Sequence, residues 1–201
     1  MINRLNLNCS KHPDFIGSWM LQDTAICDNL IKVFENNSNN HNPGILGNGK
    51  KQLTAKNSTD MTISPKDLEK EKFHDVAHYI EHLKACYLDY LDQWNFLKSL
   101  SLDMHIGSFN IQKYDKGGHF GLLHSERTSE ATLHRNLVWM TYLNDVKKGG
   151  ETEFPMFGLK VKPEKSKTLI WPADWTHAHL GAVVTQGHKY IITGWMHFPI
   201  S

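Results

Sequence analysis

The stretch RNLVWMTYLNDVKKGGETEFP occupies residues 135–155. Residues 137–143 within it are almost continuously apolar, which is typical of a buried β-strand. Gly149-Gly150 and Pro155 then interrupt the pattern with residues that favour turns. We therefore predict a buried strand followed by turns, as in a protein built from several short strands.

Other strand-like segments lie on both sides of this stretch. From about Met104 onward the apolar pattern has a period of two, since Phe109 and Ile111 alternate with polar residues. Further short apolar segments bordered by glycine or proline are residues 158–161, 168–171 and 188–198. A run of short strands of this kind is typical of an antiparallel barrel made of two sheets.

Helical spacing of apolar residues dominates the first hundred residues instead. It predicts one helix over residues 25–34, and one helix, or two with a break, over residues 73–94. Ser64-Pro65 looks like the start of this second helical region, because serine caps helices and proline fits their first turn. Residues 36–63 are rich in Asn, Ser, Gly and Lys, which predicts a long surface loop.

This order of elements predicts an α+β fold with a mostly β core, in which helices back an antiparallel double-sheet barrel. We expect a single domain over residues 1–201. In it, residues 1–100 provide helical support and the surface loop, and residues 101–201 form the barrel and carry the chemistry.

Composition argues against several classes of protein. The 201 residues include 22 Lys and Arg against 21 Asp and Glu, and a net charge of +1 does not favour nucleic-acid or membrane-surface binding. The chain has no apolar run of about 18 residues and starts without the apolar core of a signal peptide. Cys9, Cys27 and Cys86 are scattered, which indicates a reducing compartment. We expect a cytoplasmic protein without nucleic-acid or membrane partners.

Histidine is frequent, with 13 copies, and two short motifs combine it with further metal-binding groups. His124-Ser125-Glu126 places an imidazole and a carboxylate on one side of an extended segment. His177-Ala178-His179 supplies two more imidazoles later in the chain. Two histidines and one carboxylate on one face of an ion form the facial triad of non-haem Fe(II) oxygenases, with open positions opposite. Either His177 or His179 could complete such a triad.

The last predicted strand carries a lysine on an apolar face. Lys189, Thr193 and Trp195 share one face of this strand with Ile191. An inward-facing lysine is costly unless an anion pairs with it, and Thr193 and Tyr114 would be further donors to the same carboxylate. The alternative is that Lys189 extends its ammonium to solvent at the end of the strand.

Two other motifs suggest different chemistry. Residues 44–51 nearly match a phosphate-binding loop, but they end in Lys51 where a hydroxyl is needed. His78, Glu81 and His82 fit the inverted zinc-peptidase pattern, which makes a zinc hydrolase an alternative function. Because the apolar stripe of this helix lies on the other side, we expect the histidine face, which includes His74, to be solvated.

Several pieces of the second half of the chain occur together, in the same order, in one known family. Over residues 114–198 the sequence resembles the prolyl-4-hydroxylase-like branch of the 2-oxoglutarate/Fe(II)-dependent oxygenases. The matching pieces are Tyr114-x-x-Gly117, His124-x-Glu126, Arg135, Thr141-Tyr142-Leu143-Asn144-Asp145-Val146, Gly149-Gly150-Glu151-Thr152-x-Phe154-Pro155, Val161-x-Pro163, His179 and Gly187-x-Lys189-Tyr190 to Trp195.

The resemblance implies a double-stranded β-helix, the jelly-roll or cupin-like barrel, with Fe(II) at its mouth. It assigns the metal to His124, Glu126 and a distal histidine. His179 is preferred to His177 for this role, because it stands ten residues before Lys189. The resemblance also places Arg135 where relatives contact substrate. The residues that it implies for 2-oxoglutarate are Lys189 and Thr193 at the far carboxylate, with Tyr114, Tyr142 and Trp195 beside them.

The activity implied is that of an Fe(II)- and 2-oxoglutarate-dependent dioxygenase. Its expected substrate is a prolyl or other amino-acid residue of a peptide, or a small molecule, which is hydroxylated while succinate and CO2 are released. The implied cofactors are Fe(II), 2-oxoglutarate as cosubstrate and O2, with ascorbate as an optional reductant. The family usually has aspartate where Glu126 stands. The alternative is therefore a metal-binding jelly-roll module without turnover.

Overall fold

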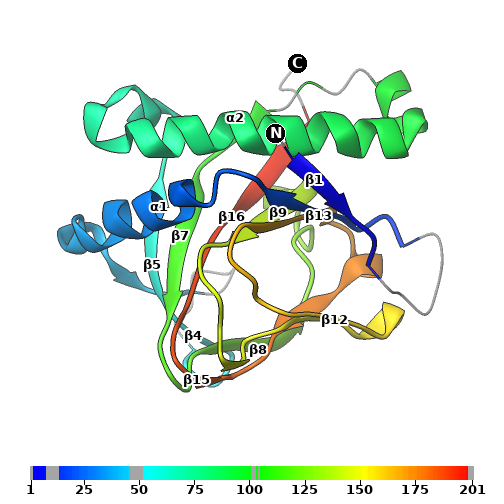
Figure 1. Cartoon of the computed structure of the whole chain (residues 1–201). Helices are drawn as coiled ribbons and strands as arrows, with labels where there is room; N and C mark the ends of the chain where they lie inside the picture. The colour runs from blue at the N-terminus through cyan, green and yellow to red at the C-terminus, as the bar shows by residue number, and fades with distance from the viewer. Residues whose placement is uncertain (1, 8–13, 46–51, 101–102, 104, 199–201) are drawn as a thin grey trace.

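The computed structural model describes residues 2–7, 14–45, 52–100, 103 and 105–198. Within them, a large antiparallel sheet and a smaller one face each other, and helices cover the outer side of the large sheet (Figure 1). This arrangement confirms the predicted double-stranded β-helix backed by helices. None of the described helices is both long enough and apolar enough to cross a membrane.

The large sheet is built around the apolar stretch over residues 137–143. In spatial order its strands are β1 (Ile2–Leu5), β2 (Gly17–Leu21), β13 (Lys167–Pro172), β9 (Arg135–Tyr142), β16 (Lys189–His197), β7 (Phe109–Tyr114), β5 (Thr59–Ile63) and β3 (Asn42–Pro43), and β6 (His105–Ile106) pairs with β16. The smaller sheet consists of β12 (Leu159–Val161), β11 (Thr152–Phe154), β14 (His179–Gly181), β8 (His119–His124) and β4 (Lys56–Asn57), while β10 (Lys148–Gly149) pairs with β15 (Val184–Gln186).

The central strands of the large sheet contribute to two separate cores, because successive side chains point to opposite faces. On β9, Trp139 joins the core beneath the helices, whereas Val138 and Met140 join the core between the two sheets. On β16, Ile192 joins the core beneath the helices, and Ile191 joins the core between the two sheets. The second core is the wall of the barrel interior.

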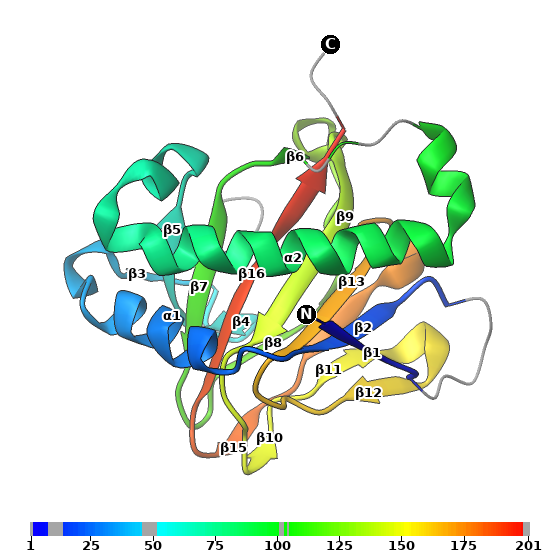
Figure 2. The ribbon, with the colours of Figure 1, turned by 45° about the horizontal axis from the view of Figure 1, so that its top comes forward.

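Two helices lie across the outer face of the large sheet: α1 (Ala25–Glu35) and α2 (His74–Gln93) (Figure 2). Tyr79 of α2 forms a buried hydrogen bond between its hydroxyl and Thr141 Oγ1 of β9, at 2.7 Å. The 3₁₀ turns are η1 (Ser38–Asn40), η2 (Pro65–Glu69), η3 (Glu71–Phe73), η4 (Asn95–Leu100), η5 (Glu130–Thr132), η6 (Pro155–Phe157) and η7 (Trp175–His177).

The first hundred residues contain more strand than their sequence predicts. Strands β1 and β2 extend the large sheet, and β5 pairs with β7, so the expectation of a surface loop over residues 36–63 is wrong for its last part. Ser64-Pro65 begins a 3₁₀ turn, because Lys70 is extended and interrupts the helical path before α2. The unbroken α2 confirms the single-helix form of the second prediction. Residues 46–51 of the loop resembling a phosphate site, and Cys9, lie outside the described residues.

Candidate metal and cosubstrate site

The pairing of β8 with β14 brings two histidines together. In the antiparallel register, His124 at the end of β8 stands opposite His179 at the start of β14. Glu126 follows two residues after His124, and its Oε1 lies 3.3 Å from His124 Nε2 and 3.7 Å from His179 Nε2. The structure therefore gathers the three predicted ligand atoms around one point, all within 4.8 Å of one another.

Both imidazoles are oriented by backbone carbonyl groups. His124 Nδ1 lies 2.8 Å from the Leu122 carbonyl oxygen, and His179 Nδ1 lies 3.0 Å from that of His177. A proton on each Nδ1 satisfies these contacts and leaves the Nε2 lone pairs for a metal ion. Burial lowers the pKa of His179 to about 4, so this ring is neutral at pH 7.

Glu126 is held by groups on the two central strands of the large sheet. Trp195 Nε1 donates to Glu126 Oε2 at 3.0 Å, and Arg135 donates to the Glu126 carbonyl oxygen at 3.1 Å. Arg135 also lies flat over the Trp195 ring, with Cζ 3.6 Å from the ring centroid. Burial alone would raise the pKa of Glu126, but a hydrogen bond from His124 and nearby positive charge lower it to about 2.

These donors fit Fe(II). Two imidazole nitrogens and one carboxylate oxygen on one side of a point form the donor set of a facial triad, and the other side opens into a pocket of about 1190 Å³. The extra methylene of Glu126, compared with aspartate, is accommodated because Trp195 holds the second carboxylate oxygen. Phe120 stacks on the His124 ring with centroids 3.8 Å apart, which shields the site from solvent.

Lys189 faces the same pocket from β16 and is 2% exposed. Its ammonium donates to the Gly150 carbonyl oxygen at 3.0 Å, and among the described residues no carboxylate forms an ion pair with it. Burial lowers the pKa of Lys189 to about 8. The prediction that Lys189 faces inward is confirmed, and the alternative that its ammonium reaches solvent is wrong.

The space beside this ammonium suits a small dicarboxylate. A side chain at Gly181 would lie 3.6 Å from Lys189 Nζ, and glycine leaves that volume open. Gly181 stands two residues, roughly 7 Å, beyond His179 on β14. An extended 2-oxoglutarate can therefore reach from the triad to Lys189, which fits the implied cosubstrate.

Two residues expected beside the cosubstrate lie differently. The Thr193 hydroxyl donates to the Trp139 carbonyl oxygen at 2.9 Å, and four strand residues, about 13 Å, separate it from Lys189. The expectation that both bind one carboxylate is therefore wrong. Tyr142 lies in the core behind the pocket wall, with its hydroxyl on Thr152 Oγ1 at 2.6 Å.

Tyr114 keeps its predicted place on the pocket wall. Its ring centroid lies 4.5 Å from Lys189 Nζ, while its hydroxyl donates to Gln112 Oε1 at 2.7 Å. Trp195 also lines the pocket, although its polar edge contacts Glu126 and not the space beside Lys189. Arg135 lines the pocket mouth, and its predicted contact with substrate stays a prediction.

His177 is excluded from the triad by its own contacts. It ends the η7 turn, and its Nε2 lies 2.7 Å from the Asp14 carbonyl oxygen, while its Nδ1 faces Thr176. A strand through residues 177–179 would have put both histidines on one side, but β14 begins only at His179. The structure thus brings His179 to His124 and Glu126.

A buried ion pair on the pocket wall escaped the sequence analysis. Lys56 Nζ lies 2.7 Å from Asp60 Oδ2, which also accepts a hydrogen bond from Gln112 at 3.2 Å. The period-two pattern of residues 59–63, with Met61 and Ile63 on one face and Asp60 on the other, could have revealed this strand.

Comparisons with known proteins agree with this geometry. Residues 109–197 match the family described as the 2OG-Fe(II) oxygenase superfamily. Probable prolyl 4-hydroxylase 9 of Arabidopsis thaliana is 30% identical over 46% of this chain and 41% of its own length. Prolyl 4-hydroxylase 2 of the same plant is 27% identical over 94% of this chain and 68% of its length.

Solved structures with low sequence identity share the fold. A prolyl-4-hydroxylase of Pseudomonas putida matches with a TM-score of 0.69 and 15% identity over 94% of this chain and 95% of that one. A prolyl hydroxylase from Trichoplax adhaerens, in complex with a hypoxia inducible factor peptide fragment, matches with a TM-score of 0.68 and 13% identity over 92% and 84%. Residues 109–197 of the chain are thus similar to the 2OG-Fe(II) oxygenase superfamily, and the curated relatives that the chain resembles are named prolyl 4-hydroxylases.

Proposed function

We propose that the protein is an Fe(II)- and 2-oxoglutarate-dependent dioxygenase. Its reaction would hydroxylate a prolyl or other amino-acid residue of a peptide, or a small molecule, with release of succinate and CO2. The observation that carries this proposal is the shared pocket. One side of it holds a triad of two imidazoles and one carboxylate, and another holds the buried ammonium of Lys189, which no carboxylate of the described residues pairs with.

Each part of the site has a separate task. His124, Glu126 and His179 would hold the metal on one face and leave its other positions toward the pocket. Bound Fe(II), together with 2-oxoglutarate and O2, supplies the oxidising power for hydroxylation. Lys189 would neutralise and orient the far carboxylate of the cosubstrate, while aromatic rings around the histidines limit access of water.

The pocket mouth is suited to an extended peptide. Leu122 and Leu123 of β8 are 46% and 52% exposed, and both line the pocket next to the triad. Ser129 and Thr132 line the same region and offer hydroxyl groups. A segment that carries a prolyl ring could place its apolar residues on these leucines, and the relatives named prolyl 4-hydroxylases support this substrate class.

Turnover is the test of this proposal. The protein would be loaded with Fe(II) without oxygen, mixed with 2-oxoglutarate and a library of proline-containing peptides, and then exposed to oxygen. We expect succinate in proportion to the 2-oxoglutarate consumed and a mass gain of one oxygen atom in a productive peptide. Glu126→Ala should abolish both signals, whereas Glu130→Ala, a change at an exposed residue, should preserve them.

Two results would contradict the proposal. If Fe(II) and 2-oxoglutarate bind but no succinate forms with or without peptides, the protein is the metal-binding module without turnover. If succinate forms equally well with Glu126→Ala, the oxidation does not use this triad.

A further inference from the structure

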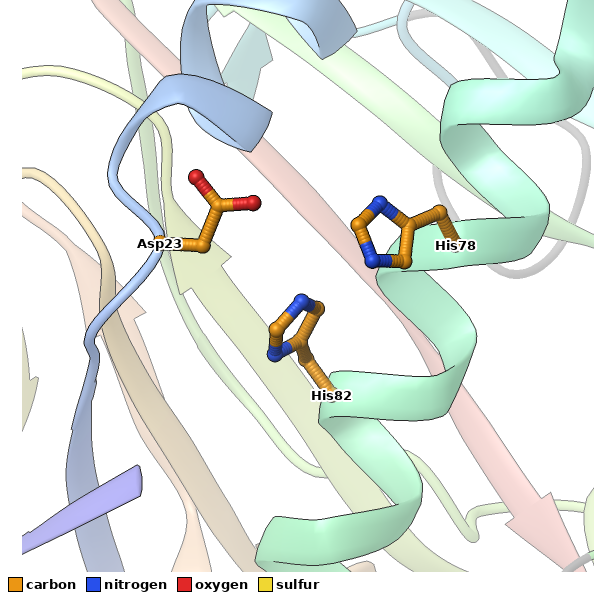
Figure 3. A group of neighbouring side chains, drawn as sticks. All are labelled: Asp23, His78 and His82. Carbon is orange, nitrogen blue, oxygen red and sulfur yellow. The ribbon is translucent and has the colours of Figure 1, made fainter. Parts of the chain in front are cut away.

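A second group of converging metal ligands lies on the helical side of the large sheet, apart from the pocket. It comprises Asp23, His78 and His82, whose ligand atoms lie within 4.8 Å of one another (Figure 3). Asp23 belongs to the turn between β2 and α1, and the two histidines stand one turn apart on α2. None of the three lines the pocket described above.

Helix geometry explains why the two histidines of this group lie side by side. Residues four apart share one helix face, and the His78 and His82 ring centroids are 4.9 Å apart. The packing of α1 beside α2 brings the turn that carries Asp23 over this face (Figure 3). The apolar pattern of the helix predicts a solvated histidine face. This prediction is wrong for His82, which is half-buried.

The polar atoms of this group are poorly satisfied by the protein itself. His82 Nε2 is buried, and no hydrogen-bond partner for it exists in the described part of the chain. Asp23 Oδ1 accepts a hydrogen bond from the Ala25 backbone N–H at 3.1 Å, which fixes the carboxylate. Among the described residues, no Lys or Arg forms an ion pair with Asp23, and no hydrogen bond links it to either histidine.

An ion would satisfy all three groups at once. Bonds of about 2.0–2.2 Å from nitrogen and oxygen to a central ion bring neighbouring donor atoms roughly 3–3.5 Å apart. His78 is exposed, so a change of its rotamer can close the remaining gap.

We propose that Asp23, His78 and His82 form a second metal site, which binds a divalent transition-metal ion such as Zn²⁺ and joins helix α2 to the turn before α1. Two imidazoles and one carboxylate suit Zn²⁺ better than Mg²⁺ or Ca²⁺, which prefer oxygen ligands alone. Water completes the coordination on the exposed side. Glu81, the base of the zinc-peptidase pattern, is exposed and is not among the three converging residues.

Counting bound Zn²⁺ tests this proposal. Metal-free full-length protein is titrated with Zn²⁺ by calorimetry, both as the wild type and as a His124→Ala/His179→Ala variant that lacks the pocket triad. We expect two Zn²⁺ per chain in the wild type and one in the double variant. Adding Asp23→Asn to the double variant should weaken the remaining site by roughly tenfold or more. Asparagine keeps an oxygen for the Ala25 N–H, so the turn should stay folded.

His74→Ala provides the matched control, because His74 is exposed on the same helix but outside the group. It should leave the count at two, whereas His82→Ala should reduce it to one. The proposal is overturned if the double variant binds no Zn²⁺, or if Asp23→Asn and His82→Ala bind Zn²⁺ as the His74→Ala protein does. Succinate production by Asp23→Asn loaded with Fe(II) should match the wild type, so this result is independent of the proposed oxygenase activity.

Discussion

At the scale of single residues, the two oxygens of Glu126 have different surroundings. Oε1 faces the histidines, whereas Oε2 accepts a hydrogen bond from Trp195 and lies 3.5 Å from Arg135. A glutamate has one more rotatable bond than an aspartate, so it needs such contacts to keep one oxygen on the metal. The stacked pair of Arg135 and Trp195 provides them. This pair therefore positions the ligand and does not itself bind metal.

Trp195→Phe tests that positioning role. Phenylalanine keeps an aromatic ring beneath Arg135 but removes the N–H that donates to Glu126 Oε2. We expect the affinity for Fe(II) to fall about 10- to 100-fold, the usual cost of losing an outer-shell contact, with little change in thermal unfolding. Anaerobic Fe(II) titration measures this, and Trp175→Phe, at a residue 73% exposed, is the control. Equal iron affinity in all three proteins would contradict the role.

Lys189 predicts a pH dependence of 2-oxoglutarate binding. Burial lowers its pKa to about 8, and a bound carboxylate would raise it again. Below pH 8 the ammonium is already charged, so affinity should be nearly constant. Above pH 8 binding must take up a proton, and affinity should fall by up to about tenfold per pH unit.

Calorimetric titration of metal-loaded, oxygen-free protein between about pH 7 and 9.5 measures this dependence. Lys189→Arg keeps the charge throughout this range and should remove the decline, while Lys189→Ala should weaken 2-oxoglutarate binding at every pH and leave metal binding intact. A wild-type affinity that does not change with pH would remove Lys189 from the carboxylate site.

At the scale of elements, the turn between β9 and β11 positions the carbonyl that holds Lys189. Gly149 and Gly150 have φ angles of +80° and +77°, and the Gly150 oxygen accepts the Lys189 hydrogen bond. A Cβ at Gly149 would lie 2.1 Å from the Val183 carbonyl oxygen. The Gly-Gly pair is therefore required both by its backbone conformation and by the close approach of β15.

Gly149→Ala and Gly187→Ala separate these two requirements. Gly187 also has a positive φ, +89°, but nothing lies within 4 Å of its missing Cβ. Alanine at Gly187 should lower the free energy of unfolding by about 1–2 kcal/mol through backbone strain alone. At Gly149 the added clash should raise the loss to about 3 kcal/mol or more. Urea denaturation measures both, and equal losses would show that the approach of Val183 is not rigid.

Local patterns were enough to predict the central elements. The apolar run in β9, the alternation in β16 and the helical spacing in α1 are set by neighbours in sequence, and each element appears where expected. Strands β1 and β2 were missed because they are short and depend on pairing: β2 pairs with β13, which lies far away in the chain, and β1 pairs with β2.

For the candidate site, too, local patterns were predictable from the sequence and contacts between distant residues were not. Residue types and strand parity singled out His124 and Lys189, which lie on β8 and β16, and Glu126, which follows β8 by two residues. The resemblance favoured His179 over His177 by its spacing to Lys189, and the structure supplies the physical reason, because η7 turns His177 toward Asp14. The contact of Trp195 with Glu126 joins residues 69 positions apart, and no local pattern indicates it.

At the scale of the whole molecule, the two faces of the large sheet have separate tasks. The outer face packs on α1 and α2 through a large apolar core (Figure 2). The inner face, opposite the smaller sheet, carries polar residues among apolar ones and opens as the pocket. The three proposed metal ligands come from the smaller sheet and its connections, and Lys189, which we propose binds the cosubstrate, comes from the large one.

The proposed function depends on one Fe(II) ion held by three side chains in this pocket. Anomalous diffraction at the iron edge, from crystals grown without oxygen with Fe(II) and 2-oxoglutarate, tests it most directly. We predict an iron peak about 2.0–2.2 Å from His124 Nε2, Glu126 Oε1 and His179 Nε2, with the far carboxylate of 2-oxoglutarate beside Lys189. Iron bound elsewhere, or a 2-oxoglutarate that makes no contact with Lys189, would contradict it.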